Sequence, residues 1–327
     1  MRIAVDAMGG DNAPREVVAG TLKAAAEFAD TGFVLVGDAQ AVETELKRSG
    51  EAVPSNVTVE HAPQVMEMGD APVEAVRGKR QSSVTVSARL VSTGDAEAMF
   101  SAGNTGAAVA VATVLLKPLA GIKRSGIAVT FPTHKGSTTV IDVGANIHCR
   151  PLHLMQYGIM ASVYCEQILG MKTPRVGLLN IGAESEKGNE LVLETRRLLE
   201  EHPRINFVGN IEGYDIHNGT CDVAVCEGFV GNVVLKIAEG MSASLLSDVE
   251  AAFRNAFPRS FGEYAGVIDQ IRRRNDSAEY GGAPLLGVDG ICIIGHGRSD
   301  TRAVFNALRV ARGFAGQQVN KRIAEAI

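Results

Sequence analysis

The chain has 327 residues, of which 46% are hydrophobic and 21% charged, with a formal net charge of −5. This length calls for one large α/β unit or two lobes, and the negative charge argues against a broad nucleic-acid surface. Five cysteines without a CxxC pair indicate a reducing compartment and argue against structural zinc. The start predicts a strand rather than a signal peptide, and no apolar run of about 18 residues predicts a membrane span.

The first third of the chain predicts alternating strands and helices. Strands are expected at 3–5, 33–36 and 57–59, with helices at about 14–30 and up to about 48. This βαβαβ order predicts a parallel sheet with helices on its faces. Asp6 and Asp11 bracket two glycines just past the first strand, where ligands bind in such sheets, although helix capping explains Asp11 equally well.

The next strand, at 98–101, leads into Gly103-Asn104-Thr105-Gly106 and a helix of small residues at 107–116. Unpaired N–H groups at a helix start favour an anion, so this turn is a candidate anion cradle; tight helix packing is the alternative.

Two further strands, at 127–130 and 138–141, are expected to be joined by a tight turn at 133–136. Asp142 and Asn146 follow the second strand, and His148, Cys149 and His153 come soon after. Their spacing is not that of a metal site, and the sequence supplies no partner that would orient a Cys–His nucleophile pair. We therefore expect no metal.

A strand at 176–179 ends in a polar turn that contains Glu184 and Lys187. A lysine at this place can balance an anion or a developing oxyanion, or it can simply pair with Glu184 or Glu190 on the helix surface.

A strand at 223–226 leads through Glu227-Gly-Phe-Val-Gly-Asn232 into another helix. Gly228 and Gly231 would let a ligand approach the backbone, but an ordinary strand-to-helix turn would look the same.

Residues 241–280 predict a helical insertion that protrudes from a single catalytic unit spanning 1–327. Its apolar residues are flanked by Arg254, Arg259 and Arg272-Arg-Arg274, which suits an anionic membrane surface or a dimer contact equally well. The stretch 280–288 predicts a loop into a last strand at 290–294. His296 follows that strand and is the best-placed histidine, although hydrogen bonding to a backbone carbonyl would look identical.

Six polar turns follow predicted strands, at Asp6, Gly103, Asp142, Ile181, Glu227 and Gly295. If the sheet is largely parallel, they share one edge and surround one cleft. None is a P-loop, a clean GxGxxG or a GxSxG elbow, so we expect no dinucleotide or other cofactor. Transfer to a bound anion is favoured over covalent catalysis.

Six motifs together resemble the phosphate acyltransferases of bacterial phospholipid synthesis (the PlsX family). They are Asp6-Ala-Met-Gly-Gly-Asp11, Ala102-Gly-Asn-Thr-Gly-Ala107, Asp142-Val-Gly-Ala-Asn146, Cys226 to Lys236, Tyr280-Gly-Gly-Ala-Pro-Leu-Leu-Gly287 and Gly295-His-Gly-Arg-Ser299. They stand in family order across essentially the whole chain. Ala183 departs from the polar or charged residue expected in many relatives.

The resemblance implies a Rossmann-like αβα sandwich with a mainly parallel sheet, related to phosphotransacetylases and isopropylmalate dehydrogenases. It implies transfer of a fatty acyl group from acyl carrier protein to inorganic phosphate by a cytoplasmic homodimer at the membrane periphery. The acyltransferase that moves the acyl group of acyl phosphate to glycerol 3-phosphate, with release of phosphate, is a further expected partner. Alternatives are a short-chain phosphotransacetylase that uses coenzyme A and a non-enzymatic membrane scaffold.

The family's catalytic roles fall on Lys187 and Asn232. Our expected phosphate and substrate contacts are Asp6, Gly103, Asn104, Thr105, Gly106, Asp142, Asn146, Glu184, Gly231, His296 and Ser299. The acidic carrier protein would be steered by Lys79 and Arg80 or by the arginines at 272–274.

Overall fold

The structure is a computed structural model, and it describes residues 1–50, 52–258, 261–274, 279 and 281–327. Its strands are β1 (Arg2–Asp6), β2 (Gly32–Gly37), β3 (Val57–His61), β4 (Ala98–Ser101), β5 (Gly126–Thr133), β6 (Gly136–Ile141), β7 (Arg175–Leu179), β8 (Asn206–Ile211), β9 (Val223–Val225), β10 (Ala283–Leu286) and β11 (Ile291–Ile294). They form one sheet in the order β3-β2-β1-β4-β11-β10-β5-β6-β9-β7-β8.

The sheet consists of two parallel groups that run in opposite directions. β1, β2, β3, β4 and β11 are mutually parallel, and so are β6, β7, β8 and β9. Between them, β10 is antiparallel to both neighbours, and β5 is antiparallel to β6. The carboxyl ends of the two groups therefore lie at opposite edges of the sheet.

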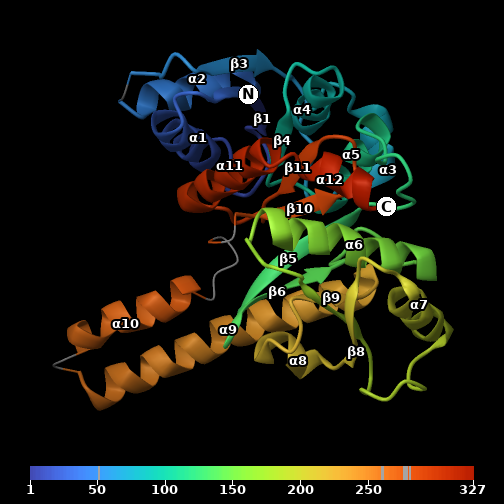
Figure 1. The fold of residues 1–327 in the computed structure, drawn as a ribbon. Coiled ribbons are helices and arrows are strands. Elements are labelled where there is room, and N and C mark those ends of the chain that lie inside the picture. The colour runs from blue at the N-terminus through green and yellow to red at the C-terminus, as the bar shows by residue number, and fades with distance from the viewer. Residues whose placement is uncertain (51, 259–260, 275–278, 280) are drawn as a thin grey trace.

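Helices cover both faces of this sheet (Figure 1). They are α1 (Arg15–Glu27), α2 (Ala39–Arg48), α3 (Pro72–Gly78), α4 (Ser83–Ser92), α5 (Thr105–Leu115), α6 (Pro151–Gln167), α7 (Glu190–Glu201), α8 (Gly213–Asn218), α9 (Gly228–Ala256), α10 (Phe261–Arg274), α11 (Thr301–Gly316) and α12 (Val319–Ala326).

Strand residues alternate between two hydrophobic clusters, as a pleated strand buried on both faces requires. Ile3 and Val5 of β1 join α1, α2, α6, α7, α11 and α12 in one cluster. Ala4, between them, joins α4, α5 and α8, with apolar side chains of α9 packed against the same cluster. The expected αβα sandwich with a mainly parallel sheet is confirmed.

Two expectations about the last third of the chain are wrong. The expected loop at 280–288 contains a strand, β10, which pairs over two residues with β11 and over two with β5. The helix expected after Asn232 and the start of the insertion expected at 241 instead form one continuous helix of 29 residues, α9.

Helices α9 and α10 extend from the body as an arm of two antiparallel helices (Figure 1). The rings of Phe253, Phe257 and Tyr264 pack with centroids 5.4–6.0 Å apart, and Arg254 lies 4.3 Å from the ring centroid of Phe261. The insertion was expected to start at 241. The helix that forms the first half of the arm, α9, starts earlier, at Gly228. Residues 259 and 280, and the side chain of Arg274, lie outside the described part of the chain.

Among the described residues, α9 is the one helix long and apolar enough to cross a membrane by length and composition. Our criterion of an unbroken apolar run excluded it. Its first turn is nevertheless packed into the body, because Gly228 and Gly231 are buried.

Candidate active site

The first turn of α9 is closed to an external anion. The Glu227 carboxylate caps the helix and accepts hydrogen bonds from the N–H groups of Phe229 (2.7 Å) and Val230 (3.0 Å). The N–H of Gly228 donates to the carbonyl of Asn146, and that of Gly231 to the carbonyl of Glu227. The chain's own oxygens thus fill the cradle that the sequence had suggested.

Gly231 is required for a different reason. A Cβ at this position would lie 1.9 Å from the carbonyl oxygen of Asp142, so the glycine lets α9 pack directly on the backbone that follows β6. Gly231 was expected to contact phosphate. We correct this assignment, because the space that a side chain would fill here is taken by the protein's own backbone.

Asp142 holds this turn together from the inside. Its carboxylate is fully buried and accepts hydrogen bonds from the N–H groups of Ile127, Gly144, Ala145 and Asn146 at 2.8–3.1 Å. Burial raises the pKa of this carboxyl, and the backbone hydrogen bonds oppose the rise. The expected phosphate contact at Asp142 is wrong, because its oxygens are already used.

Asn146 belongs to the same internal network. Its amide donates to the carbonyl of Ser125 at 2.6 Å, to the hydroxyl of Tyr157 at 3.0 Å and to the Asp142 carboxylate at 3.2 Å. Its expected substrate contact is likewise corrected to a role in the turn.

The Asp6 and Gly103 turns pack against each other at the opposite edge of the sheet. Asp6 is 2% exposed and accepts a hydrogen bond from the Ser101 hydroxyl at 2.6 Å. Burial raises its pKa. A Cβ on Gly9 would lie 2.6 Å from the Asp6 carboxylate and 2.8 Å from the nitrogen of Gly103. Asp6 and Gly103 are therefore interior residues and not ligand contacts.

Asn104 caps α5 and leaves the helix start open. Its side-chain oxygen accepts from Ala107, and its amide donates to the carbonyls of residues 67, 68 and 70. We correct its expected phosphate contact, because both ends of the amide are occupied. Within the described residues, the N–H groups of Thr105 and Gly106 donate to no protein acceptor.

These two residues line a cavity of about 1000 Å³ between the two halves of the sheet. Asn232, His296 and Ser299 line it as well. Helix α9 also contributes Leu235, Leu246 and Glu250 to the cavity wall. Apolar lining residues also come from the sheet, namely Ile127, Val129, Val143, Ala283 and Ile294.

Asn232 comes from the first turns of α9 and lies beside the glycine of the Asp142 turn. A Cβ on Gly144 would be 3.8 Å from the Cβ of Asn232, and Gly144 has a φ of 141°, which favours glycine. The side chain of Asn232 is thereby placed at the rim where the turn meets the cavity.

His296 accepts hydrogen bonds from two residues of its own loop. Its Nδ1 accepts a hydrogen bond from the N–H of Arg298 at 3.2 Å, and its carbonyl accepts from the Ser299 hydroxyl at 2.7 Å. Because Nδ1 is the acceptor, the neutral ring carries its proton on Nε2. Arg298 also lines the cavity, and our sequence analysis had not singled it out.

Lys187 and Glu184 are not among the described residues that line this cavity. Their turn follows β7 and is fixed by Asn180, which donates to the Lys187 carbonyl at 2.9 Å, and by Asn210, which donates to the Glu184 carbonyl at 2.7 Å. In the described part of the chain, Lys187 forms no ion pair with Glu184 or Glu190, so the expected surface pairing does not form.

Five of the six turns contribute residues to the lining of this cavity, and among the described residues the turn at Ile181 contributes none. Those at Asp6, Gly103 and Gly295 lie at one edge of the sheet, and those at Asp142, Ile181 and Glu227 at the other. The reversal of direction across β10 and β5 places the two groups at opposite edges, but the Asp142 turn, through Val143 and Gly144, and α9, through Asn232, line the cavity from the second group.

Solved phosphotransacetylases share this fold. The EutD phosphotransacetylase from Staphylococcus aureus superposes with a TM-score of 0.60 at 15% identity, covering 100% of this chain and 94% of that one. A phosphotransacetylase from Streptococcus pyogenes gives a TM-score of 0.64 at 15% identity, over 98% and 94% of the two chains. The architecture is therefore that of the phosphotransacetylases.

Sequence comparison is more specific. The family model for "Fatty acid synthesis protein" matches residues 1–322. The phosphate acyltransferase of Pelotomaculum thermopropionicum is 47% identical over 329 residues, covering 100% of this chain and 94% of its own. That of Citrifermentans bemidjiense is 45% identical over 327 residues, covering 99% and 92%. The chain belongs to the phosphate acyltransferase family of fatty acid and phospholipid synthesis, and it is an enzyme of that class.

Proposed function

We propose that this enzyme transfers a fatty acyl group from acyl carrier protein to inorganic phosphate, giving acyl phosphate and free carrier protein. The cavity of about 1000 Å³ carries this proposal. Its volume lies at the top of the roughly 300–1,000 Å³ range of small-molecule sites and far exceeds what an acetyl group needs. Its mixed lining, apolar along the sheet and α9 and polar at the 296–299 loop, suits an acyl chain that ends in a reacting carbonyl.

At the polar end, the free N–H groups of Thr105 and Gly106 and the guanidinium of Arg298 are suited to hold phosphate. A phosphate oxygen attacks the thioester carbonyl, the new C–O bond forms and the C–S bond breaks. The electron pair leaves on the carrier's sulfur as a thiolate. The amide of Asn232 donates to the carbonyl oxygen as it gains negative charge.

Lys187 keeps the second catalytic role in this proposal. Its turn lies at the same sheet edge as the start of α9, because β7 and β9 are parallel neighbours. Since its ammonium forms no ion pair within the described residues, it is available to the thioester or the leaving thiolate once donor is bound.

Fewer basic residues are available to attract the acidic carrier protein than the sequence suggested. Lys79 is paired with Asp70, and Arg272 is paired with Glu250 and Asp269. Arg80 and Arg273 form no ion pair within the described residues, and we propose them as the steering cations.

The arm supports a proposal about assembly. Exposed apolar side chains form a stripe along α9, hereafter the α9 stripe: Val233, Ile237, Met241, Leu245 and Val249, each at least 41% exposed. A stripe of this length is typical of an interaction surface. We propose that two copies pair through it, with the arm tips at the surface of a membrane on the cytoplasmic side. The acyltransferase that consumes acyl phosphate would then meet its substrate there.

The test is release of carrier thiol by purified enzyme, with and without phosphate. We expect release from a long-chain acyl carrier protein only when phosphate is present. Faster release from acetyl coenzyme A would instead identify a short-chain phosphotransacetylase. If neither donor shows phosphate-dependent release, the protein is a non-enzymatic scaffold.

A further inference from the structure

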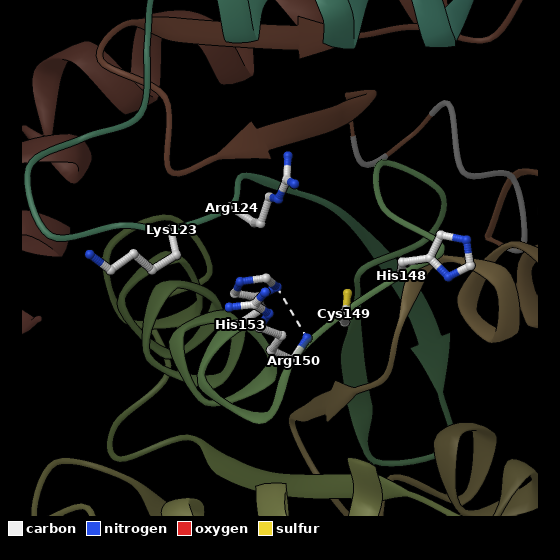
Figure 2. Close-up of a pocket in the computed structure, with 6 residues that line it drawn as sticks. All are labelled: Lys123, Arg124, His148, Cys149, Arg150 and His153. Carbon is white, nitrogen blue, oxygen red and sulfur yellow. Dashed lines mark hydrogen bonds between the residues drawn. The ribbon is translucent and has the colours of Figure 1, made fainter.

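A second pocket, of about 500 Å³, lies outside the cavity and shares no lining residue with it. It is lined by Lys123, Arg124, His148, Cys149, Arg150 and His153, which we call the basic pocket (Figure 2). Lys123 and Arg124 precede β5, whereas the other four residues lie between the Asp142 turn and the first turn of α6.

Among the residues that the structure describes, no carboxylate lines the basic pocket. Within the described residues, Lys123, Arg124 and Arg150 form no ion pair, although the chain carries 37 acidic residues against 32 basic ones. Some arginines elsewhere are paired, as Arg175 is with Asp222 at 2.9 Å and Arg312 with Asp30 at 2.8 Å. Three unpaired cations in one concave site repel one another until an anion enters.

His153 adds a directed donor. Its Nδ1 accepts a hydrogen bond from the N–H of Arg150 at 3.2 Å, so the neutral ring carries its proton on Nε2 (Figure 2). Burial lowers the pKa of His153, and the nearby charges of Arg124 and Arg150 lower it further. Arg124, Arg150 and His153 all line this one pocket.

We propose that the basic pocket binds the dianionic phosphate group of a small organic phosphate monoester. Arginine guanidinium groups match phosphate oxygens in pairs of hydrogen bonds, and a lysine supplies a point charge. The volume leaves room for an organic portion beyond the phosphate itself. This site is separate from the cavity proposed for acyl transfer.

Cys149 is a built-in reporter of occupancy. It is the one partly exposed cysteine of the five, since the others are buried. Its alkylation can be followed on its own peptide by mass spectrometry in the absence of acyl donor. The result is therefore independent of whether the proposed acyl transfer is correct.

The experiment measures the alkylation rate of the whole chain with propyl phosphate, inorganic phosphate or dimethyl phosphate at constant ionic strength. We expect saturable slowing by propyl phosphate and none by the singly charged diester. In Arg124→Gln, the concentration for half protection should rise roughly tenfold or more. Lys172→Gln removes the same charge from an exposed site beyond the other end of α6 and should match the wild type.

Slowing by inorganic phosphate as strong as that by propyl phosphate would keep the dianion site but make free phosphate its ligand. No slowing by either dianion, equal protection in Arg124→Gln, or equal protection by dimethyl phosphate overturns the proposal. If circular dichroism shows that Arg124→Gln is unfolded, Lys123→Gln, at another exposed lining residue, replaces it.

Discussion

Single side chains in this enzyme divide into those that build turns and those that face the cavity. Asp142 shows the first kind, because its buried carboxylate is surrounded by backbone donors. Asn232 shows the second, because it lines the cavity beside an open turn. A polar residue after a strand is therefore not by itself a ligand contact, and burial separates the two kinds.

Asn232→Ala should lower kcat roughly 10²–10³-fold, as loss of one oxyanion donor does. Lys187→Ala should reduce kcat by a comparable factor if it contacts the reacting thioester. Asn206→Ala is a control, since this exposed amide donates only to the Thr173 carbonyl. The thiol-release assay measures all three, and near wild-type turnover in both Asn232→Ala and Lys187→Ala would refute the assignment.

The Cys149 thiol should lose its proton at an unusually high pH. Burial raises its pKa to about 11, so the reactive thiolate grows about tenfold per pH unit up to that pH. An ordinary cysteine, with a pKa of about 8.5, levels off earlier. Iodoacetamide rates between about pH 7 and 9.5, compared with a small free thiol, check this; a plateau near pH 8.5 would contradict it.

Among the elements, α9 has the largest part in the site. Glu227 caps it, Gly231 sets it on the Asp142 turn, and its next turns supply Asn232 and the cavity wall. The sequence motif around Gly231 is thus explained mostly by packing. Of the motif's described residues, Asn232 and Leu235 line the cavity.

Two glycines of α9 should respond oppositely to alanine. Gly231→Ala places a Cβ 1.9 Å from the Asp142 oxygen, and overpacking of this kind costs roughly 1–3 kcal/mol or more. Gly240→Ala meets nothing within 4 Å and should stabilise the helix by roughly 0.4–1 kcal/mol. Urea unfolding measures both, and equal effects would show that the contact at Gly231 does not matter.

The sequence was informative about where elements lie and less so about what they do. Strands at 3–5 and 33–36 were evident from their apolar runs, and the tight turn at 133–136 joins β5 to β6 as expected. Direction was not evident, because an apolar strand reads the same either way and the reversal depends on which neighbours pair. Glu227 could have been recognised as a cap from its place before a helix.

The basic pocket also escaped the sequence analysis. His148, Cys149 and His153 were weighed only as metal or nucleophile candidates. Lys123 and Arg124 lie some 25 residues earlier in the sequence, and only the fold brings them to the start of α6. Cationic residues spread over two segments carry no spacing signal.

At the scale of the whole molecule, the α9 stripe governs assembly in our proposal. Ile237→Asp with Leu245→Asp should shift the protein from dimer to monomer, because burying two charges in an apolar interface is unfavourable. Leu193→Asp is the matched control, since this leucine on α7 is 40% exposed. Light scattering after gel filtration gives the masses, and an unchanged mass in the double variant would exclude the stripe as the interface.

The length of α9 has one more consequence. At 1.5 Å per residue its 29 residues form a rod about 43 Å long, which packs on the Asp142 turn at its start and on α10 at its tip. Rotation about the start moves the tip by about 0.75 Å per degree. The rod thus works as a lever: whatever restrains the tip also restrains the α9 residues that line the cavity. A substrate that tilts the cavity wall must, by reciprocity, change how strongly the tip is held.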